Sequence, residues 1–199
     1  RAPPSFAASP RGMAGAAQRL ALSAAGREES LAGSIRITAS DIVATYVLPP
    51  ILTALHLAEP EIEIELVASD RTENLLLREA DIAVRMYRPT QADVFRKKVA
   101  EMQIGMFAAP GYLKRRGTPR QLEDFLQHDV IGYDRNEQVI EGLRAVGLEV
   151  ERDFFSFRCD NQVVCWKMVV AGFGIGFNQL SVGLAEPAVQ QIEVDVPLP

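Results

Sequence analysis

Alternation between strand-like and helix-like segments is the feature of this sequence that most constrains its fold. Apolar and polar residues alternate over residues 35–38, as they do in a strand with one buried face. Ser40-Asp41 then offers side chains suited to begin a helix. The same order recurs at residues 61–68 with Ser69-Asp70, and a further strand is expected at residues 81–85. Strands that alternate with helices form a largely parallel sheet with helices on its faces. The sequence therefore predicts an α/β fold.

A second series of alternating helices and strands is expected from about residue 110. Pro49-Pro50 marks either a second start or a kink in a helix that runs from residue 41 to about residue 57, and a long strand is expected at residues 97–109. The polar residues 134–150 are expected to form a helix or a pair of turns. Further helices are predicted at residues 72–80, 110–116, 118–126 and 162–171, and further strands at 130–133, 154–159, 174–177 and 192–196. The chain is predicted to contain two units of similar build.

Composition narrows the classes of function. The chain has 199 residues, of which 48% are hydrophobic, so it can bury a substantial core in one or two compact units. We find neither an apolar run long enough to cross a bilayer nor the layout of a secretion signal, so we expect a cytoplasmic protein with no membrane partner. A net charge of −5 has the wrong sign for a surface that gathers phosphates. We do not expect this chain to bind DNA well by itself.

The N-terminal region carries an apolar helical seam. Met13, Ala17, Leu20 and Ala24 are spaced four, three and four residues apart, after an irregular lead-in. This apolar seam fits either a surface helix or a helix that packs against a partner chain. The chain starts at Arg1 and stops at residues 196–199 without a closing element. We expect both ends to be cuts in a longer parent protein.

A search for catalytic chemistry finds no convincing set of residues. His56 and His128 lack a nucleophile or carboxylate at the spacing of a hydrolytic motif. Cys159 and Cys165 have no metal-ligand spacing, and we interpret both as packing residues. Residues 172–176 are glycine-rich but lead from a helix into a strand, the reverse of a phosphate-binding loop, which favours a helix stop and close backbone packing. No catalytic residue, metal site or cofactor is predicted.

Polar residues at the expected strand ends are the best candidates for a site. Ser40-Asp41, Ser69-Asp70 and Asp160-Asn161 each join the carboxyl end of a strand to the first turn of a helix. Backbone N–H groups at such junctions can hold an anion, and ligands of open α/β sheets bind outside these strand ends. The simpler alternative is that all three pairs serve only as helix caps.

In several segments, the sequence resembles the effector-binding domain of LysR-type transcriptional regulators. The order and spacing of these segments over residues 31–199 make the resemblance specific, whereas residues 134–149 depart from the family pattern. The segments are residues 31–38, 48–52, 81–85, 106–113 with 117–119, and 170–176.

The resemblance implies a fold like that of type 2 periplasmic binding proteins. Such a fold has two Rossmann-like α/β subdomains joined by two crossover strands, here preceded by the end of a linker helix in residues 1–33. The resemblance assigns residues 34–109 and 185–199 to subdomain I and residues 110–184 to subdomain II.

The resemblance also implies a ligand site and a role. The family's pocket positions correspond to Ser40, Ser69, Gly132 and Asn161, with Arg85 and Tyr133 as further candidates. The expected partner is a small, anionic effector in the cleft between the subdomains. DNA would be bound only through a winged helix-turn-helix that this chain lacks, in a homodimer or homotetramer.

Two other functions share this scaffold. A solute-binding protein of a transport system has the same cleft but works outside the inner membrane. An enzyme would need an acid, a base or a nucleophile set, which the sequence does not offer. The resemblance favours the regulator over both.

Overall fold

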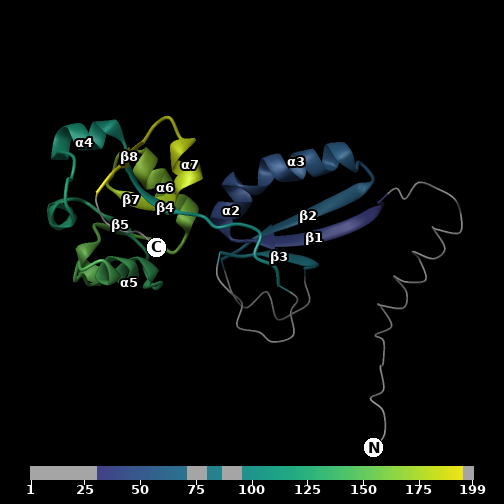
Figure 1. The fold of residues 1–199 in the computed structure, drawn as a ribbon, viewed down its shortest axis with the longest axis horizontal. Coiled ribbons are helices and arrows are strands. Elements are labelled where there is room, and N and C mark those ends of the chain that lie inside the picture. The colour runs from purple at the N-terminus through teal and green to yellow at the C-terminus, as the bar shows by residue number, and fades with distance from the viewer. Residues whose placement is uncertain (1–30, 71–79, 87–95, 195–199) are drawn as a thin grey trace, which may run out of the picture.

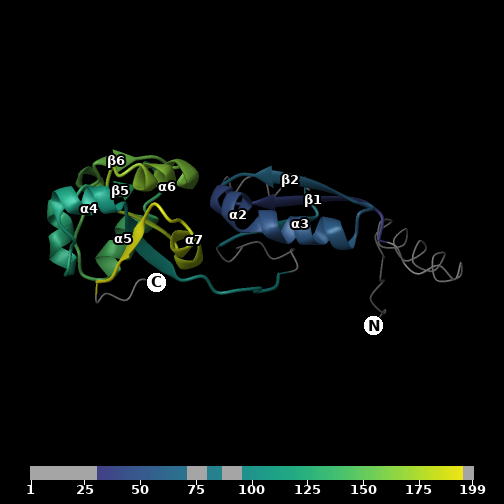
Figure 2. The same ribbon diagram turned by 90° about the horizontal axis from the view of Figure 1, so that it is seen from above.

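The computed structural model describes residues 31–70, 80–86 and 96–194, which form two lobes (Figure 1). We call residues 31–70 and 80–86 the first lobe, and residues 104–194 the second lobe. An extended segment, described over residues 96–103, leads into the second lobe, which Figure 2 shows from above. None of the helices in these residues is long and apolar enough to span a membrane.

The first lobe is built on a three-stranded parallel sheet. Its strands are β1 (Gly33–Ala39), β2 (Ile62–Ala68) and β3 (Ile82–Val84), in the order β2-β1-β3. The strands predicted at residues 35–38, 61–68 and 81–85 are therefore confirmed. Because parallel strands end at the same edge, the residues that follow β1 and β2 lie close together, and the N–H of Ser69 donates to the carbonyl of Ala39 at 2.9 Å.

Two consecutive helices, α2 (Asp41–Tyr46) and α3 (Leu48–Ala58), return from β1 to β2. Pro49 and Pro50 lie in the first turn of α3, where a missing N–H costs no helical hydrogen bond. The prolines thus mark a second helix start rather than a kink. The helix predicted at residues 72–80 lies almost entirely outside the described residues.

The predicted faces of β2 are correct in part. Glu63 and Glu65 are exposed, and Ile64 packs against the core, as the alternation predicts. Leu66 lies on the same face of β2 as Ile64, but this residue is 39% exposed, so the core covers it less than the alternation predicts. Among the described strands β2 is an edge strand, so this side chain is covered less than one on a central strand.

The described strands of the second lobe pair both in parallel and antiparallel, whereas the alternating pattern predicts a largely parallel sheet. The central strand β4 (Ile104–Ala108) runs antiparallel to β7 (Gly176–Gln179) and β8 (Gln190–Ile192). β5 (Ile131–Gly132) and β6 (Phe157–Arg158) pair in parallel, and a parallel bridge joins Val130, directly before β5, to Ile175, directly before β7. In the β7-β4-β8 sheet, β4 and β8 come from predicted subdomain I and β7 comes from predicted subdomain II. The lobes therefore do not coincide with the predicted subdomains, whose boundaries at 109/110 and 184/185 stay a prediction.

The helices of the second lobe follow the sequence pattern more closely than its strands do. The segment predicted as a helix at 118–126 is a 3-10 helix, and the strand predicted at 154–159 is shortened because a 3-10 turn occupies its start. The strand predicted at 97–109 is regular only over β4. The helical elements are α4 (Pro110–Arg116), the 3-10 helices η2 (Leu122–Gln127) and η3 (Arg152–Phe154), α5 (Gln138–Ala145), α6 (Gln162–Val170) and α7 (Leu180–Leu184).

The glycine-rich segment at residues 172–176 ends a helix and packs closely, as predicted. Gly172 adopts φ +79°, which L side chains rarely adopt, directly after α6. A Cβ on Gly174 would lie 2.2 Å from the carbonyl oxygen of Asp129. The close approach lets the N–H of Ile175 donate to the carbonyl of Asp129 and the N–H of Ile131 donate to the carbonyl of Ile175, both at 2.8 Å.

The lobes share one hydrophobic cluster. Ile42 and Val43 of α2 belong to the same buried cluster as Trp166 of α6 and Phe107 of β4. The rings of Trp166 and Phe107 meet edge to face with centroids 5.6 Å apart. A separate cluster around Tyr112, Phe125 and Ile175 lies within the second lobe.

Two glycine substitutions test this packing. Gly142→Ala in α5 should raise the free energy of unfolding by about 0.5–1 kcal/mol, because alanine is the better helix former and its Cβ would meet nothing within 4 Å. Gly174→Ala should lower it by about 1–3 kcal/mol, since a backbone carbonyl occupies the space. Denaturant unfolding measures both, and equal effects would contradict the close approach at Gly174.

Candidate functional site

The ends of β1 and β2 meet the second lobe through the start of α2. Ser40 is the N-cap residue of α2 and is only 8% exposed. Its hydroxyl does not cap the helix, and it has no hydrogen-bond partner among the described residues. A buried hydroxyl without a partner is unusual and favours a role outside helix capping.

A direct hydrogen bond joins the two lobes beside Ser40. Asn161 Nδ2 donates to Asp41 Oδ2 at 2.9 Å, across 120 residues of sequence. Asn161 Oδ1 also accepts from the N–H of Val164 at 3.0 Å, so this side chain caps α6 and bridges the lobes at once. The N–H of Asp41 donates to Asp70 Oδ1 at 3.1 Å. The strand ends thus carry two neighbouring carboxylates on the first lobe.

Arg85 brings a positive charge to these carboxylates. Its Nη2 donates to Thr38 Oγ1 at 3.0 Å and its Nη1 to the carbonyl of Val84 at 3.3 Å. Its Nε is buried and unpaired in the part of the chain that the structure describes. Burial raises the pKa of Asp70, the Asp41 carboxylate adds to the increase, and a hydrogen bond from the Asp41 N–H and the charge of Arg85 oppose it.

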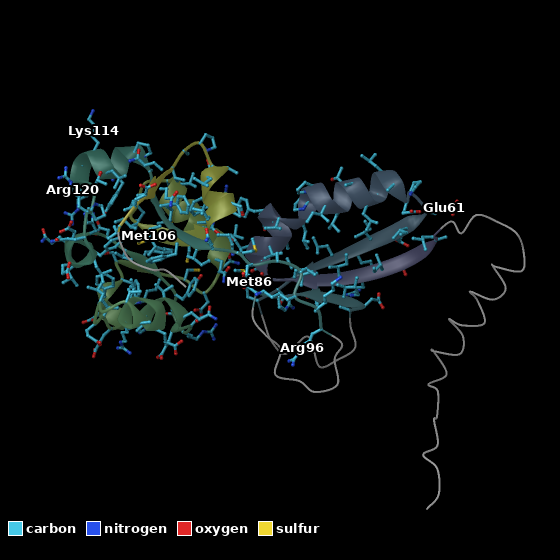
Figure 3. The ribbon with its side chains drawn as sticks, viewed as in Figure 1. Glu61, Met86, Arg96, Met106, Lys114 and Arg120 are labelled. Carbon is cyan, nitrogen blue, oxygen red and sulfur yellow. The ribbon has the colours of Figure 1, made fainter. Side chains whose placement is uncertain are left out.

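The next residue, Met86, also contacts the second lobe. Gln179 Nε2 lies 2.9 Å from Met86 Sδ, and Figure 3 places Met86 where the lobes meet. The Gln179 side-chain oxygen and the Asn178 side-chain nitrogen are buried without a partner in the described residues. Polar groups of β7 therefore add to this junction.

Gly132 and Tyr133 lie at the end of β5, on the second-lobe side. The carbonyl of Gly132 accepts from the N–H of Cys159 at 3.2 Å, and a Cβ at Gly132 would lie 2.5 Å from the ring of Phe155. Burial raises the pKa of the Tyr133 hydroxyl, with smaller contributions from Cys165 and Asp70. Asp70 belongs to the first lobe, so its charge acts on Tyr133 across the contact between the lobes.

The structure brings most of the predicted residues to one junction, with Tyr133 near Asp70, whereas Gly132 packs against Phe155 within the second lobe. Ser40, Ser69 and Arg85 come from the first lobe, and Gly132, Tyr133 and Asn161 from the second. Their roles in binding a ligand remain predictions. Sequence reasoning treated Asp41 and Asp70 only as parts of helix starts and missed their charges at the junction, although each follows a serine directly after a strand.

Asp160 belongs to the supporting structure rather than to the free surface of the junction. Its carboxylate accepts hydrogen bonds from the N–H groups of Asp134, Arg135 and Asn136 and pairs with the guanidinium of Arg135 at 2.8 Å. These bonds lower the pKa of Asp160 to about 2. Asp160 thus anchors the loop after β5 and leaves Asn161 as the member of the pair that faces the first lobe.

Cys165 and His128 contact neighbouring residues of the second lobe. Burial raises the pKa of Cys165 to about 12, so its thiol stays protonated, and its Sγ lies 3.0 Å from the carbonyl of Cys159. His128 Nδ1 pairs with the hydroxyl of Tyr112 at 3.1 Å within the second lobe. Among residues 31–70, 80–86 and 96–194, no group of His, Cys, Asp and Glu is arranged to hold a metal ion.

Two α/β lobes that share a core and meet at strand ends define the class of two-lobed ligand-binding domains. The family profile described as the LysR substrate binding domain matches residues 28–199. The chain belongs to the LysR substrate-binding domain family.

Known relatives agree with this assignment. The chain is 31% identical over 112 residues to the Mau operon transcriptional activator of Paracoccus denitrificans, which is 51% of this chain and 40% of that protein. It is 28% identical over 101 residues to the HTH-type transcriptional regulator CrgA of Neisseria meningitidis, covering 51% of this chain and 34% of CrgA. The matches thus span less than half of these curated relatives.

Solved structures support the fold. The regulatory domain of CrgA from Neisseria meningitidis superposes with a TM-score of 0.73 at 19% identity, covering 81% of each chain. The full-length virulence activator AphB of Vibrio cholerae superposes with a TM-score of 0.65 at 23% identity, covering 92% of this chain and 65% of that one. These neighbours confirm the type 2 periplasmic-binding-protein-like fold.

The two helix starts at the junction give a matched prediction. Ser40→Ala should change the free energy of unfolding by less than about 0.5 kcal/mol, because its hydroxyl makes no cap bond. Asn161→Ala should lower it by about 1–2 kcal/mol, because the cap of α6 and the bond to Asp41 are both lost. Chemical denaturation distinguishes them. A larger loss for Ser40→Ala would contradict the geometry.

Proposed function

We propose that this chain is the effector-sensing part of a LysR-type transcriptional regulator and that the effector binds at the junction described above. The Asn161–Asp41 hydrogen bond carries the proposal, because it ties the first turns of α2 and α6 together across the lobes. A ligand at this point would touch both lobes at once. Family membership and the regulators among its relatives support the role.

The effector acts by favouring one arrangement of the lobes. A ligand shifts an equilibrium only by its difference in affinity between the two states, and a few kcal/mol suffices. Groups that compete for Asp41 or Asn161 would exchange the direct bond between lobes for bonds to the ligand. The resulting change in lobe angle would be passed to the rest of the parent protein.

The charges at the junction refine the class of effector. The charge of Arg85 and the unpartnered Ser40 hydroxyl suit an anionic group such as a carboxylate, once a change in lobe angle uncovers them. Asp41 and Asp70 lie beside them and would repel an anion that had nothing else to offer. The effector is therefore a small acid that also carries a hydroxyl or amino donor for these carboxylates.

The parent protein supplies what this chain does not. A winged helix-turn-helix in the parent would bind DNA, and pairing into a homodimer or homotetramer would set how two such heads lie on an operator. The parent would work in the cytoplasm and without catalysis. The solute-binding alternative is not favoured, since the reported relatives are transcriptional regulators.

A thermal-shift screen with small hydroxy and amino acids tests this proposal. A true effector should raise the melting temperature of the chain, and Arg85→Ala should remove most of that increase because the anion loses its charged partner. Arg120→Ala is the matched control, since Figure 3 shows Arg120 on the second lobe, far from the junction. An increase that survives in Arg85→Ala but is lost in Arg120→Ala would place the ligand elsewhere.

A further inference from the structure

Buried polar atoms without a hydrogen-bond partner gather where the two lobes meet. Among the described residues these side-chain atoms belong to Ser40, Tyr46, Arg85, Trp166, Asn178 and Gln179, which we call the unpaired set. Tyr46 of the first lobe and Trp166 of the second line one cavity between the lobes. Gln179 contacts Met86 of the first lobe, and Asn178 precedes it on β7. The other two members, Ser40 and Arg85, lie at the junction of strand ends.

The separate core of the second lobe treats a buried hydroxyl differently. The Tyr112 hydroxyl accepts from the N–H of Asp129 at 2.8 Å and pairs with His128 Nδ1 at 3.1 Å. A tyrosine packed within one lobe thus finds partners, whereas Tyr46, packed between the lobes, does not. A buried polar group without a partner forfeits the hydrogen bonds that it makes with water. The unpaired set therefore weakens the contact between the lobes.

Two contributions oppose each other at this contact. Burial of Ile42 and Val43 in one apolar cluster with Phe107 and Trp166 favours closed lobes. Separation of the lobes lets water reach the unpaired set, and each group then regains a hydrogen bond. The difference between the two contributions decides how often the lobes part. The loss of a single unpaired group should therefore change that frequency.

We propose that the unpaired set is a built-in opponent of the closed lobes, which part by admitting water to these groups. The arrangement in the structure is the drier of the two states, and removal of one unpaired group holds the lobes in it. Separation of this kind uncovers Ser40 and Arg85 without any ligand. The inference therefore stands apart from the proposed effector, and its test uses the ligand-free chain.

Trp166 reports the opening directly, because it is the only tryptophan in the chain and is 1% exposed at the contact between the lobes. Acrylamide reaches a buried indole when the lobes part, so the bimolecular quenching constant, obtained from fluorescence lifetimes, follows the open fraction. Tyr46→Phe should lower this constant about fivefold, the factor that one hydrogen bond is worth. Tyr112→Phe is the matched control and should not lower it, since it removes a paired hydroxyl from the other core.

The uptake of water has a test of its own. Trimethylamine N-oxide is excluded from protein surfaces and opposes their hydration. Quenching of Trp166, corrected for viscosity with a free tryptophan derivative, should fall as this osmolyte is added, and less steeply in Tyr46→Phe. The inference is overturned if Tyr46→Phe leaves the quenching constant unchanged or raises it, because the hydroxyl would then have a partner such as a bound water. It is also overturned if Tyr112→Phe lowers the constant equally, or if the osmolyte has no effect.

Discussion

The packing of α2 against α6 is the interaction on which the rest of this structure depends. Ile42 and Val43 share a buried cluster with Trp166, whose ring meets Phe107 at the centre of the second lobe. Burial of this apolar surface stabilises the contact between lobes without any directional bond. The same packing holds the N-terminal ends of α2 and α6 next to each other, which brings Asp41 to within hydrogen-bond distance of Asn161. The proposed effector site is a consequence of this core contact.

Local patterns allowed much of the first lobe to be predicted. A period of two identifies β1 and β2, and Ser40-Asp41 after β1 mark the start of α2. The second lobe was predicted less well, because the pairing of β4 with β7 and β8 joins segments about 70 to 85 residues apart, which no local pattern encodes. The resemblance to a family located the candidate site residues. The carboxylates of Asp41 and Asp70 beside Arg85, on the first-lobe side of the junction, became apparent only in three dimensions.

Hydrogen–deuterium exchange with and without a thermally stabilising acid tests the central claim most directly. A ligand that bridges the lobes should slow exchange at residues 40–44 and at residues 162–165 together, over the same range of ligand concentration, because it holds the starts of α2 and α6 in one complex. Protection confined to one of these segments, or found only away from both, would contradict an effector site between the lobes.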